Sequence, residues 1–167
     1  MEQIDEKTFA QLARLAGFGR TGFCSAAAFA AERKAVERGP EIAERRQLRF
    51  DPTADDPRTK SIAIMLWPYV PAAQEEDGCV FVDGYYFASN AAYHAARALE
   101  AQLTKAWHFA KANVSYPARE AALRAGMGVI GQNGMLITPE YGSRFVIILM
   151  ATDIVHTAPD CGEHGGC

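Results

Sequence analysis

The sequence predicts a single domain of the α+β class, in which helices flank a sheet. Residues 61–67 and 145–150 are apolar runs with the length of strands. The second run does not alternate with polar residues, which is typical of a central strand buried on both faces. Residues 91–105 instead carry apolar side chains at helical spacing. A chain of 167 residues is long enough for one domain with its own core.

The N-terminal region is predicted to begin with a helix followed by an extended segment. Asp5 or Thr8 can cap this helix, and Leu15 falls on its apolar face near the end. Gly17 is a suitable stop for the helix. The next residues, 18–24, are broken by two glycines and are expected to form a short extended stretch.

A second helix is predicted over residues 26–38, because Ser25 is a favourable N-cap and glycine and proline follow at its end. Residues 51–57 are polar and contain two prolines, so we expect a surface loop there. That loop leads into the predicted strand at 61–67.

The long helix at 91–105 is predicted to start at Ser89 or Asn90, either of which can cap it. Tyr93 belongs to the apolar stripe of this helix. An aromatic cluster at 85–87 lies just ahead of the predicted cap.

The segment from 115 to 153 combines a short helix with two apolar runs. Pro117 can open a helix over 118–125, and Gly126 suits the left-handed position just beyond it. The apolar runs at 135–138 and 144–152 are separated by a short turn-forming segment, which predicts a β-hairpin with a longer loop.

Glycines are frequent in this same segment, and they permit two interpretations. Backbone amides freed from side chains can approach a phosphate, a flavin or a larger ring. Equally, the glycines can serve only turns and close helix–sheet packing. The spacing matches neither the Gly-x-Gly-x-x-Gly dinucleotide motif nor a phosphate-binding loop ending in Gly-Lys-Ser/Thr.

The run REAALRAGMGVIGQNGMLITPEYGSRF, with the later Thr152-Asp153 pair, resembles the segment that marks epoxyqueuosine reductases and the related reductive dehalogenases. Weaker similarity extends upstream to Gly17-Phe18 and to residues 65–71. The resemblance implies a nitroreductase-like α+β domain with a mixed sheet that binds cobalamin. It implies in addition a module with two four-iron clusters after that domain.

On this resemblance we expect residues 1–155 to form the cobalamin-binding domain and 156–167 to begin an incomplete iron–sulfur segment. The residues expected to contact the cofactor are Arg119, Gly126, Gly128, Gly131, Asn133, Gly142, Ser143 and Arg144. Arginines can hold carboxylate or amide groups with two parallel hydrogen bonds. Either arginine could instead form a structural ion pair with Glu120 or Glu140.

The C-terminal tail contains two thiols and two imidazoles within twelve residues. The resemblance makes Cys161 or Cys167 a first ligand of a 4Fe-4S cluster, which takes four thiolates. Because the sequence supplies too few, we expect it to be a fragment cut within that module, although loss of the module is an alternative. A zinc site with His156 and His164, and a disordered tail, are further alternatives.

Proton donation is the step for which the sequence departs from the resemblance. Epoxyqueuosine reductases have an aspartate a little before the position of Arg119, whereas residues 113–116 of this chain contain no carboxylate. Tyr116 is therefore the candidate catalytic acid, as a tyrosine is in reductive dehalogenases. The alternative is that Tyr116 is a core aromatic.

Composition limits the partners. A net charge of −3 argues against strong nucleic-acid binding by this chain alone. No apolar run is long enough to span a bilayer and no secretory signal is recognised, so we expect a cytoplasmic protein.

The expected function is that of a cobalamin-dependent, iron–sulfur-linked reductase. It would act on a small molecule or modified nucleoside and receive its electrons from an iron–sulfur module or a separate electron donor. The alternative is a non-catalytic iron–sulfur electron-transfer or scaffold protein that keeps the fold.

Overall fold

A computed structural model describes residues 4–37, 47–70, 82–106 and 108–161 of the chain. Its main sheet has four strands in the order β1 (Arg20–Ser25), β2 (Ser61–Pro68), β6 (Phe145–Thr152) and β3 (Ala110–Ala112). All three pairings are antiparallel, so the parallel pair that a mixed sheet requires is not found among the described strands. The α+β class with flanking helices is confirmed.

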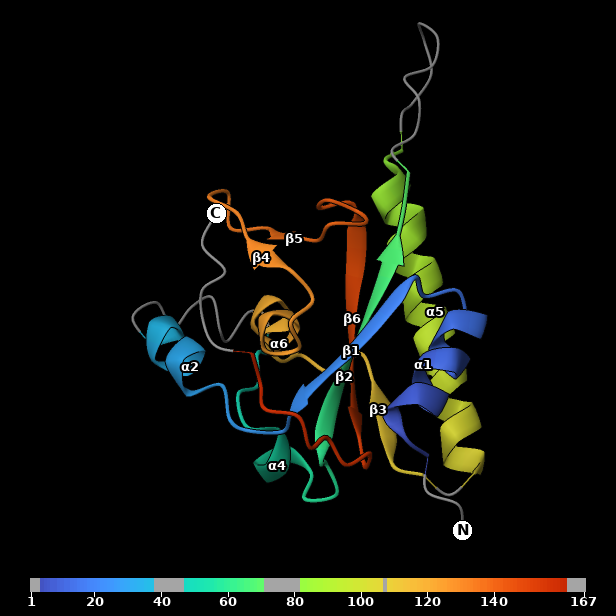
Figure 1. Ribbon diagram of the computed structural model, residues 1–167, viewed down its shortest axis with the longest axis vertical. Coiled ribbons are helices and arrows are strands. Elements are labelled where there is room, and N and C mark those ends of the chain that lie inside the picture. The colour runs from blue at the N-terminus through green and yellow to red at the C-terminus, as the bar shows by residue number, and fades with distance from the viewer. Residues whose placement is uncertain (1–3, 38–46, 71–81, 107, 162–167) are drawn as a thin grey trace, which may run out of the picture.

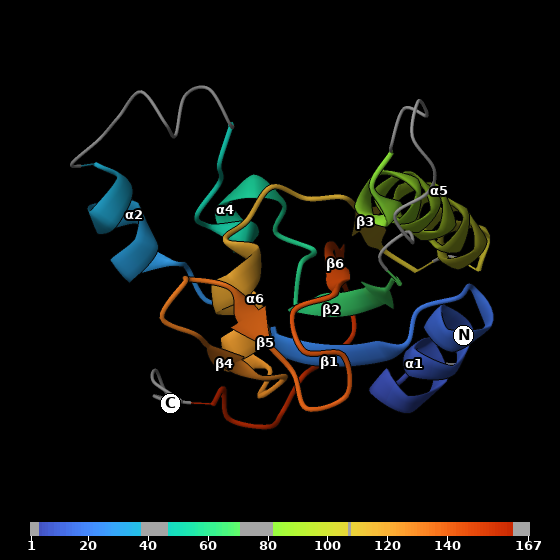
Figure 2. The same ribbon diagram turned by 90° about the horizontal axis from the view of Figure 1, so that it is seen from above.

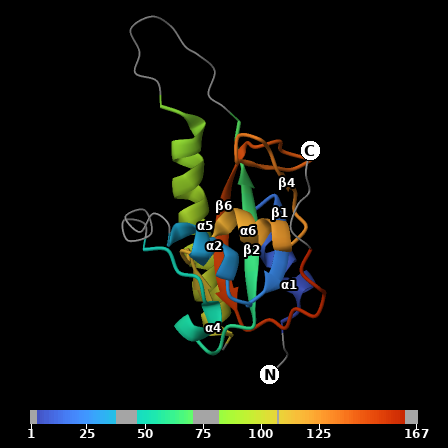
Figure 3. The ribbon, with the colours of Figure 1, turned by 90° about the vertical axis from the view of Figure 1, so that its left-hand side faces the viewer.

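Helices cover both faces of this sheet, as Figures 1 and 2 show. Helices α1 (Glu6–Leu15) and α5 (Gly84–Lys105) pack on one face. Helices α2 (Ala30–Val36) and α6 (Ala118–Arg124) lie on the other, beside the single-turn helix α4 (Pro52–Asp55). Figure 3 views the molecule from the side of α2, α4 and α6.

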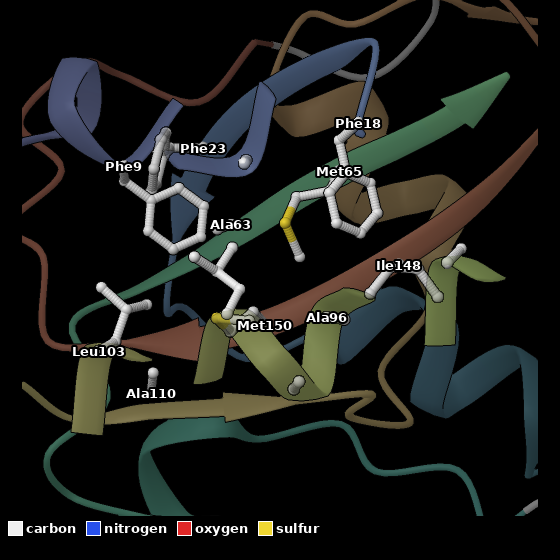
Figure 4. Packing of buried hydrophobic residues seen from close by; sticks show 14 of the residues in the cluster. Phe9, Phe18, Phe23, Ala63, Met65, Ala96, Leu103, Ala110, Ile148 and Met150 are labelled. Carbon is white, nitrogen blue, oxygen red and sulfur yellow. The ribbon is translucent and has the colours of Figure 1, made fainter. Parts of the chain in front are cut away.

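The two faces of the sheet bury two separate apolar clusters. Met65 and Met150 point toward α1 and α5, where they meet Phe9, Phe18 and Phe23 (Figure 4). The intervening β2 and β6 side chains pack under α6 in the second cluster; they are Ile62, Ile64, Leu66, Leu149 and Ala151. Because both faces are covered, β2 and β6 are apolar along most of their length rather than alternating, as predicted for a central strand.

Helix α1 begins as predicted at Asp5, whose carboxylate accepts a hydrogen bond from the Thr8 amide at 2.7 Å. Its buried face carries Phe9 and Ala13. The assignment of Leu15 to that face is wrong, because its side chain is 85% exposed. Leu15 lies in the last turn, where the chain is already leaving the sheet through Gly17, which has a φ of 106°.

The predicted start of the second helix is wrong as well. Ser25 does not cap a helix, since its amide and hydroxyl both donate to the Asp160 carboxylate, at 2.8 and 2.6 Å. It ends strand β1, and α2 starts five residues later, after the buried Phe29. The loop expected at 51–57 contains helix α4, which Asp51 caps by accepting from the Ala54 amide.

Helix α5 starts seven residues earlier than predicted. Asp83 is the N-cap and accepts from the Tyr85 amide at 2.6 Å, whereas Ser89 and Asn90 lie inside the helix and donate to the Tyr86 carbonyl. Tyr93 is not part of the buried stripe, because it is 48% exposed. The buried stripe consists of Ala88, Ala92, Ala96, Leu99 and Leu103. Its three alanines are small and let α5 lie close to the sheet.

The helix predicted after Pro117 is confirmed as α6, and Gly126 follows it with a φ of 62°. The predicted β-hairpin between 135–138 and 144–152 is wrong. Strand β5 (Leu136–Ile137) pairs with β4 (Val129–Ile130), forming a small second sheet. Strand β6 finds its partners in β2 and β3, and the turn between β5 and β6 contains an isolated bridge from Thr138 to Gly142.

A search of the described helices for a segment able to cross a lipid bilayer finds none that is both long and apolar enough.

Candidate functional site

One open hollow lies between the N-terminal end of α5, the start of α6 and the beginning of β6. We call it the β6 hollow. Its volume is about 340 Å³, and its lining is Tyr85, Arg119, Met135, Leu136, Ser143, Phe145, Val146 and Ile147. Most of this surface is apolar, with one guanidinium and two hydroxyl groups at its polar points, which is the composition expected of a ligand pocket.

Two polar residues of the β6 hollow, Arg119 and Ser143, are positioned by different elements. Arg119 projects from the first turn of α6, and its guanidinium donates a hydrogen bond to the Gly134 carbonyl in the turn between β4 and β5. Ser143 ends the turn that leads into β6, and its hydroxyl has no hydrogen-bond partner among the described residues. Two of the predicted site residues, Arg119 and Ser143, therefore line the same hollow.

Tyr116, the candidate acid, lies elsewhere. It lines a second hollow, the α2 hollow, of about 390 Å³, whose lining is Glu32, Val36, Leu48, Phe50, Tyr116, Pro117, Ala118, Arg119 and Glu120. Its ring is buried and stacks on Phe29 at a centroid distance of 6.1 Å. Burial and a hydrogen bond to the Asp55 carboxylate raise the pKa of Tyr116 well above that of a free phenol. Among the described residues, Arg119 alone lines both hollows.

The glycines face protein atoms rather than open space at three of the predicted positions, and at one of them, Gly131, an added Cβ would lie 2.7 Å from the Ile137 Cδ1 atom. A Cβ atom added to Gly128 would lie 2.3 Å from the Ile137 carbonyl oxygen, so β4 and β5 approach too closely for any side chain. At Gly126 an added Cβ would lie 2.8 Å from the Cys161 sulfur, and the φ of 62° also favours glycine. Both positions serve close packing in this fold.

The remaining turn residues bond mostly within the β4–β5 unit. The Gly131 amide donates to the Met135 carbonyl at 2.9 Å, and the Asn133 side-chain oxygen accepts from the Met135 amide at 3.1 Å. Gly142 exchanges two backbone hydrogen bonds with Thr138, and its Cα faces open space. Many backbone amides in this segment donate to other groups of the chain, and contact between these residues and a cofactor stays a prediction.

Arg144 is not brought to the β6 hollow. It is exposed and lines a separate hollow with Tyr69 and Tyr141. Of the two glutamates considered as ion-pair partners, Glu140 pairs with Arg20 at 3.0 Å and Glu120 pairs with Arg124 at 3.4 Å.

The tail after β6 runs back across the sheet and is held at several points. The His156 imidazole lies 2.7 Å from Glu6, Asp160 accepts two hydrogen bonds from Ser25, and the Cys161 amide donates to the Arg124 carbonyl at 2.7 Å. Cys161 is exposed, whereas Cys167 and His164 lie outside the described residues. Within residues 4–37, 47–70, 82–106 and 108–161, no three His, Cys, Asp or Glu side chains gather as a metal site would require.

The sequence interpretation missed the residues that form most of the β6 hollow. Tyr85 and Met135 are exposed at its rim, and Phe145–Ile147 forms part of its floor. The aromatic cluster at 85–87 was a signal for the rim. The floor gave no separate signal, because an apolar residue that lines a pocket and one that fills a core look the same in a sequence.

The β6 hollow fits one side of a corrin ring system but not the whole of it. Its apolar floor can cover part of a flat ring, while Arg119 and Ser143 can bond polar groups at the ring edge. Its volume of about 340 Å³ is at the small end of the range for ligand pockets, roughly 300–1,000 Å³. A corrinoid therefore requires further walls beyond those the described residues supply.

The chain is similar to known proteins in its structure, whereas comparison of its sequence finds no match. No family model matches the chain, and no curated protein matches it either. Several solved structures have the same fold. An epoxyqueuosine reductase bound to an epoxyqueuosine-modified tRNA stem loop superimposes with a TM-score of 0.72 at 22% identity, covering 97% of this chain and 49% of that protein.

Epoxyqueuosine reductase from Streptococcus thermophilus gives a TM-score of 0.69 at 20% identity, covering 97% of this chain and 50% of that one. A reductive dehalogenase whose structure suggests a mechanism for B12-dependent dehalogenation gives 0.62 at 15% identity, covering 99% and 22%. The expected resemblance is confirmed at the level of the fold. The chain spans about half the length of the epoxyqueuosine reductases and less than a quarter of the dehalogenase.

Proposed function

We propose that this chain is the cofactor-binding domain of a reductase and that it holds one side of a corrinoid in the β6 hollow. The supporting observation is the lining of that hollow, in which an apolar floor from β5 and β6 is combined with Arg119 and Ser143 at the edge. The fold shared with epoxyqueuosine reductases and a reductive dehalogenase supports the same reaction class. Fold alone does not determine function, so the proposal depends on the hollow.

Each group of residues has a physical role in this proposal. Phe145 and Ile147, whose side chains lie on the α6 face of β6, exclude water from the ring face they cover. The Arg119 guanidinium is anchored on the Gly134 carbonyl and keeps further N–H groups for an amide oxygen or carboxylate of the ligand. The unbonded Ser143 hydroxyl can donate to or accept from the ring edge. A bound corrinoid would supply redox-active cobalt, and the protein supplies orientation and electrostatics.

Tyr116 as proton donor is a separate prediction within this proposal. Its hydroxyl bonds to the Asp55 carboxylate, and the raised pKa means that it holds its proton more tightly than a free phenol does. Tyr116 lines the α2 hollow, and Arg119 lines both that hollow and the β6 hollow. In a reductase assembled with its cofactor, Tyr116→Phe should abolish turnover and leave corrinoid binding unchanged. Full turnover in Tyr116→Phe would remove this role.

The substrate and electron donor belong to the same proposal. We assign a small molecule or modified nucleoside as substrate, in keeping with the solved epoxyqueuosine reductase that carries a modified tRNA stem loop. Electrons would come from an iron–sulfur module or a separate donor protein. Because the chain spans only about half the length of such reductases, turnover should be measured on the longest version of the protein.

Corrinoid binding is tested by titrating the 167-residue protein with hydroxocobalamin and recording the visible spectrum. Met135 lies at the rim of the hollow and is 44% exposed, so Met135→Arg should obstruct the hollow at little cost to the fold. Val155 is 49% exposed and is not part of the hollow, so Val155→Arg is the matched control. We expect a spectral change that Met135→Arg weakens at least tenfold and Val155→Arg preserves. Absence of any change in the parent protein would refute the proposal.

An iron–sulfur electron-transfer or scaffold protein is the second candidate, and the exposed Cys161 thiol favours it. The described residues do not fit a four-iron cluster, because they contribute this one exposed thiol where four ligands are needed. Anaerobic reconstitution with iron and sulfide distinguishes the candidates. Iron bound in a Cys161-dependent way, together with no response to hydroxocobalamin, would favour the second.

A further inference from the structure

The outer face of α5 carries aromatic side chains that none of the described elements covers. Tyr86 is 61% exposed, Phe87 is 62% exposed and Tyr93 is 48% exposed. The helix lies at the outside of the molecule, and its buried stripe faces the sheet (Figure 2). Tyr86 and Phe87 meet edge to face at a centroid distance of 5.7 Å, and Tyr93 meets His94 in the same way at 5.4 Å.

The exposed residues of this face have the spacing of a seam between two helices. One row is spaced by four, three and four positions, and it consists of Tyr86, Asn90, Tyr93 and Arg97. A second exposed row lies beside the first and consists of Phe87, Ala91, His94 and Ala98. The two rows contain one arginine and no carboxylate, and the Arg97 guanidinium donates to Glu100 at 2.7 Å. The face therefore has the pattern of a surface that packs against another helix.

The size of the face is compatible with a stable contact. An aromatic side chain presents about 150–250 Å², so the exposed parts of the three rings together offer roughly 250–450 Å². The largest apolar patch on a typical monomer is about 300–600 Å² and often has a function. The remaining exposed residues of the two rows extend the face toward the roughly 800 Å² per partner of a standard interface.

The charges at the ends of α5 favour an antiparallel arrangement of two copies. Asp83 caps the start of the helix, and Lys105 lies in its last turn. An antiparallel pair brings the Asp83 end of one helix to the Lys105 end of the other, so unlike charges lie at each end of the contact. The same arrangement places Arg97 of each copy near Tyr86 of the other, where a guanidinium over an aromatic ring is favourable.

We propose that the outer face of α5 is a homodimer interface, in which the α5 helices of two copies pack antiparallel about a two-fold axis near residue 91. Such an interface is isologous, because both copies use the same face. Tyr85 lines the β6 hollow and is not part of either row. The inference is therefore independent of the corrinoid proposal.

Sedimentation velocity of the 167-residue protein tests the association, over a hundredfold range of concentration that starts in the low micromolar range. The average mass should rise with concentration from that of one chain toward that of two. NMR spectra over the same range should show amide shifts concentrated in residues 86–98. In a sample mixed from isotope-labelled and unlabelled chains, intermolecular NOEs should join Tyr86 to Arg97, which a parallel pair would keep apart.

Two variants and one control assign the association to this face. Tyr93→Glu places two carboxylates close to the two-fold axis and should weaken dimerisation at least tenfold. Phe87→Ser removes an exposed ring without adding charge and should weaken it as well, which keeps the test valid if Tyr93→Glu disturbs the helix. Val155 is 49% exposed and lies outside α5, so Val155→Glu should leave dimerisation unchanged.

Three results would each overturn the inference. One is a protein that stays monomeric at every concentration, including the case in which a further part of a longer protein covers α5. Another is a dimer that both α5 variants leave intact or that Val155→Glu weakens equally. The third is a set of concentration-dependent shifts that lies outside residues 86–98.

Discussion

At the scale of single residues, the glycines of residues 126–142 illustrate how one sequence feature can serve different physical needs. Gly128 is required by a neighbouring backbone atom, whereas Gly142 has open space beside it and is required only by its φ of 57°. The sequence shows both as glycine and does not distinguish them. Their substitution should separate the two causes.

Gly128→Ala should lower the free energy of unfolding by about 3 kcal/mol, because the added Cβ forces the Ile137 carbonyl away and disturbs the β4–β5 pair. Gly142→Ala should cost only about 1 kcal/mol from backbone strain. Urea denaturation measures both. Equal stability of Gly128→Ala and the parent protein would mean that the loop is open at this point, contrary to the structure.

Cysteine reactivity is a second property decided residue by residue. Burial raises the pKa of Cys24 to about 12, with the nearby Asp160 carboxylate as a smaller cause, so at pH 8 roughly one molecule in ten thousand carries the thiolate. Cys161 is exposed. Iodoacetamide at pH 8 should therefore label Cys161 within minutes and leave Cys24 unlabelled until the protein unfolds. Peptide mass spectrometry reads both sites, and rapid native labelling of Cys24 would contradict its burial.

At the scale of elements, the strands and the existence of the helices follow from sequence patterns, whereas helix starts and strand partners do not. Asp5, a good cap by residue type, is the cap in the structure. Ser25 and Ser89 are equally good by type, but Ser25 is bonded to Asp160, 135 residues away in sequence, and Ser89 is bonded inside α5. The strand after Gly134 pairs with β4 because β2 and β3 already occupy both edges of β6.

The start of α5 gives a direct test at this scale. Asp83→Ala removes the side chain that accepts from the Tyr85 amide and should lower stability by about 1 kcal/mol. Ser89→Ala, at the cap position favoured by the sequence, should change stability by only a few tenths of a kcal/mol, because its hydroxyl bonds within the helix. If Ser89→Ala is the more costly of the two, α5 begins where the sequence predicted.

The central strands give another test of an element. Leu66 on β2 is fully buried beneath α6, so Leu66→Ala should reduce the free energy of unfolding by about 2–5 kcal/mol. Leu15 is 85% exposed, and Leu15→Ala should be nearly neutral although the helical pattern assigned it to the core. Thermal or urea denaturation compares the pair. A large loss in Leu15→Ala would indicate that something covers α1.

At the scale of the whole molecule, the sequence predicted the α+β class, and solved structures with TM-scores of 0.62 to 0.72 confirm the resemblance as a shared fold. The structure brings only some of the predicted site residues together. Arg119 and Ser143 meet in one hollow, but Tyr116 and Arg144 line others. Which hollow each of these residues lines depends on how α6 and the β4–β5 unit lie against the sheet. A linear pattern of residue types does not encode that arrangement.

The central claim is that a corrinoid lies against β5 and β6, and hydrogen exchange of the 167-residue protein with and without hydroxocobalamin tests it most directly. Bound ligand should slow exchange at amides of residues 135, 136, 143 and 145–147, which line the β6 hollow from both sides. Exchange in α2 should be unchanged, because α2 does not contribute to that hollow. Unchanged exchange at residues 135, 136, 143 and 145–147 under saturating hydroxocobalamin, or protection confined to another part of the molecule, would contradict the account.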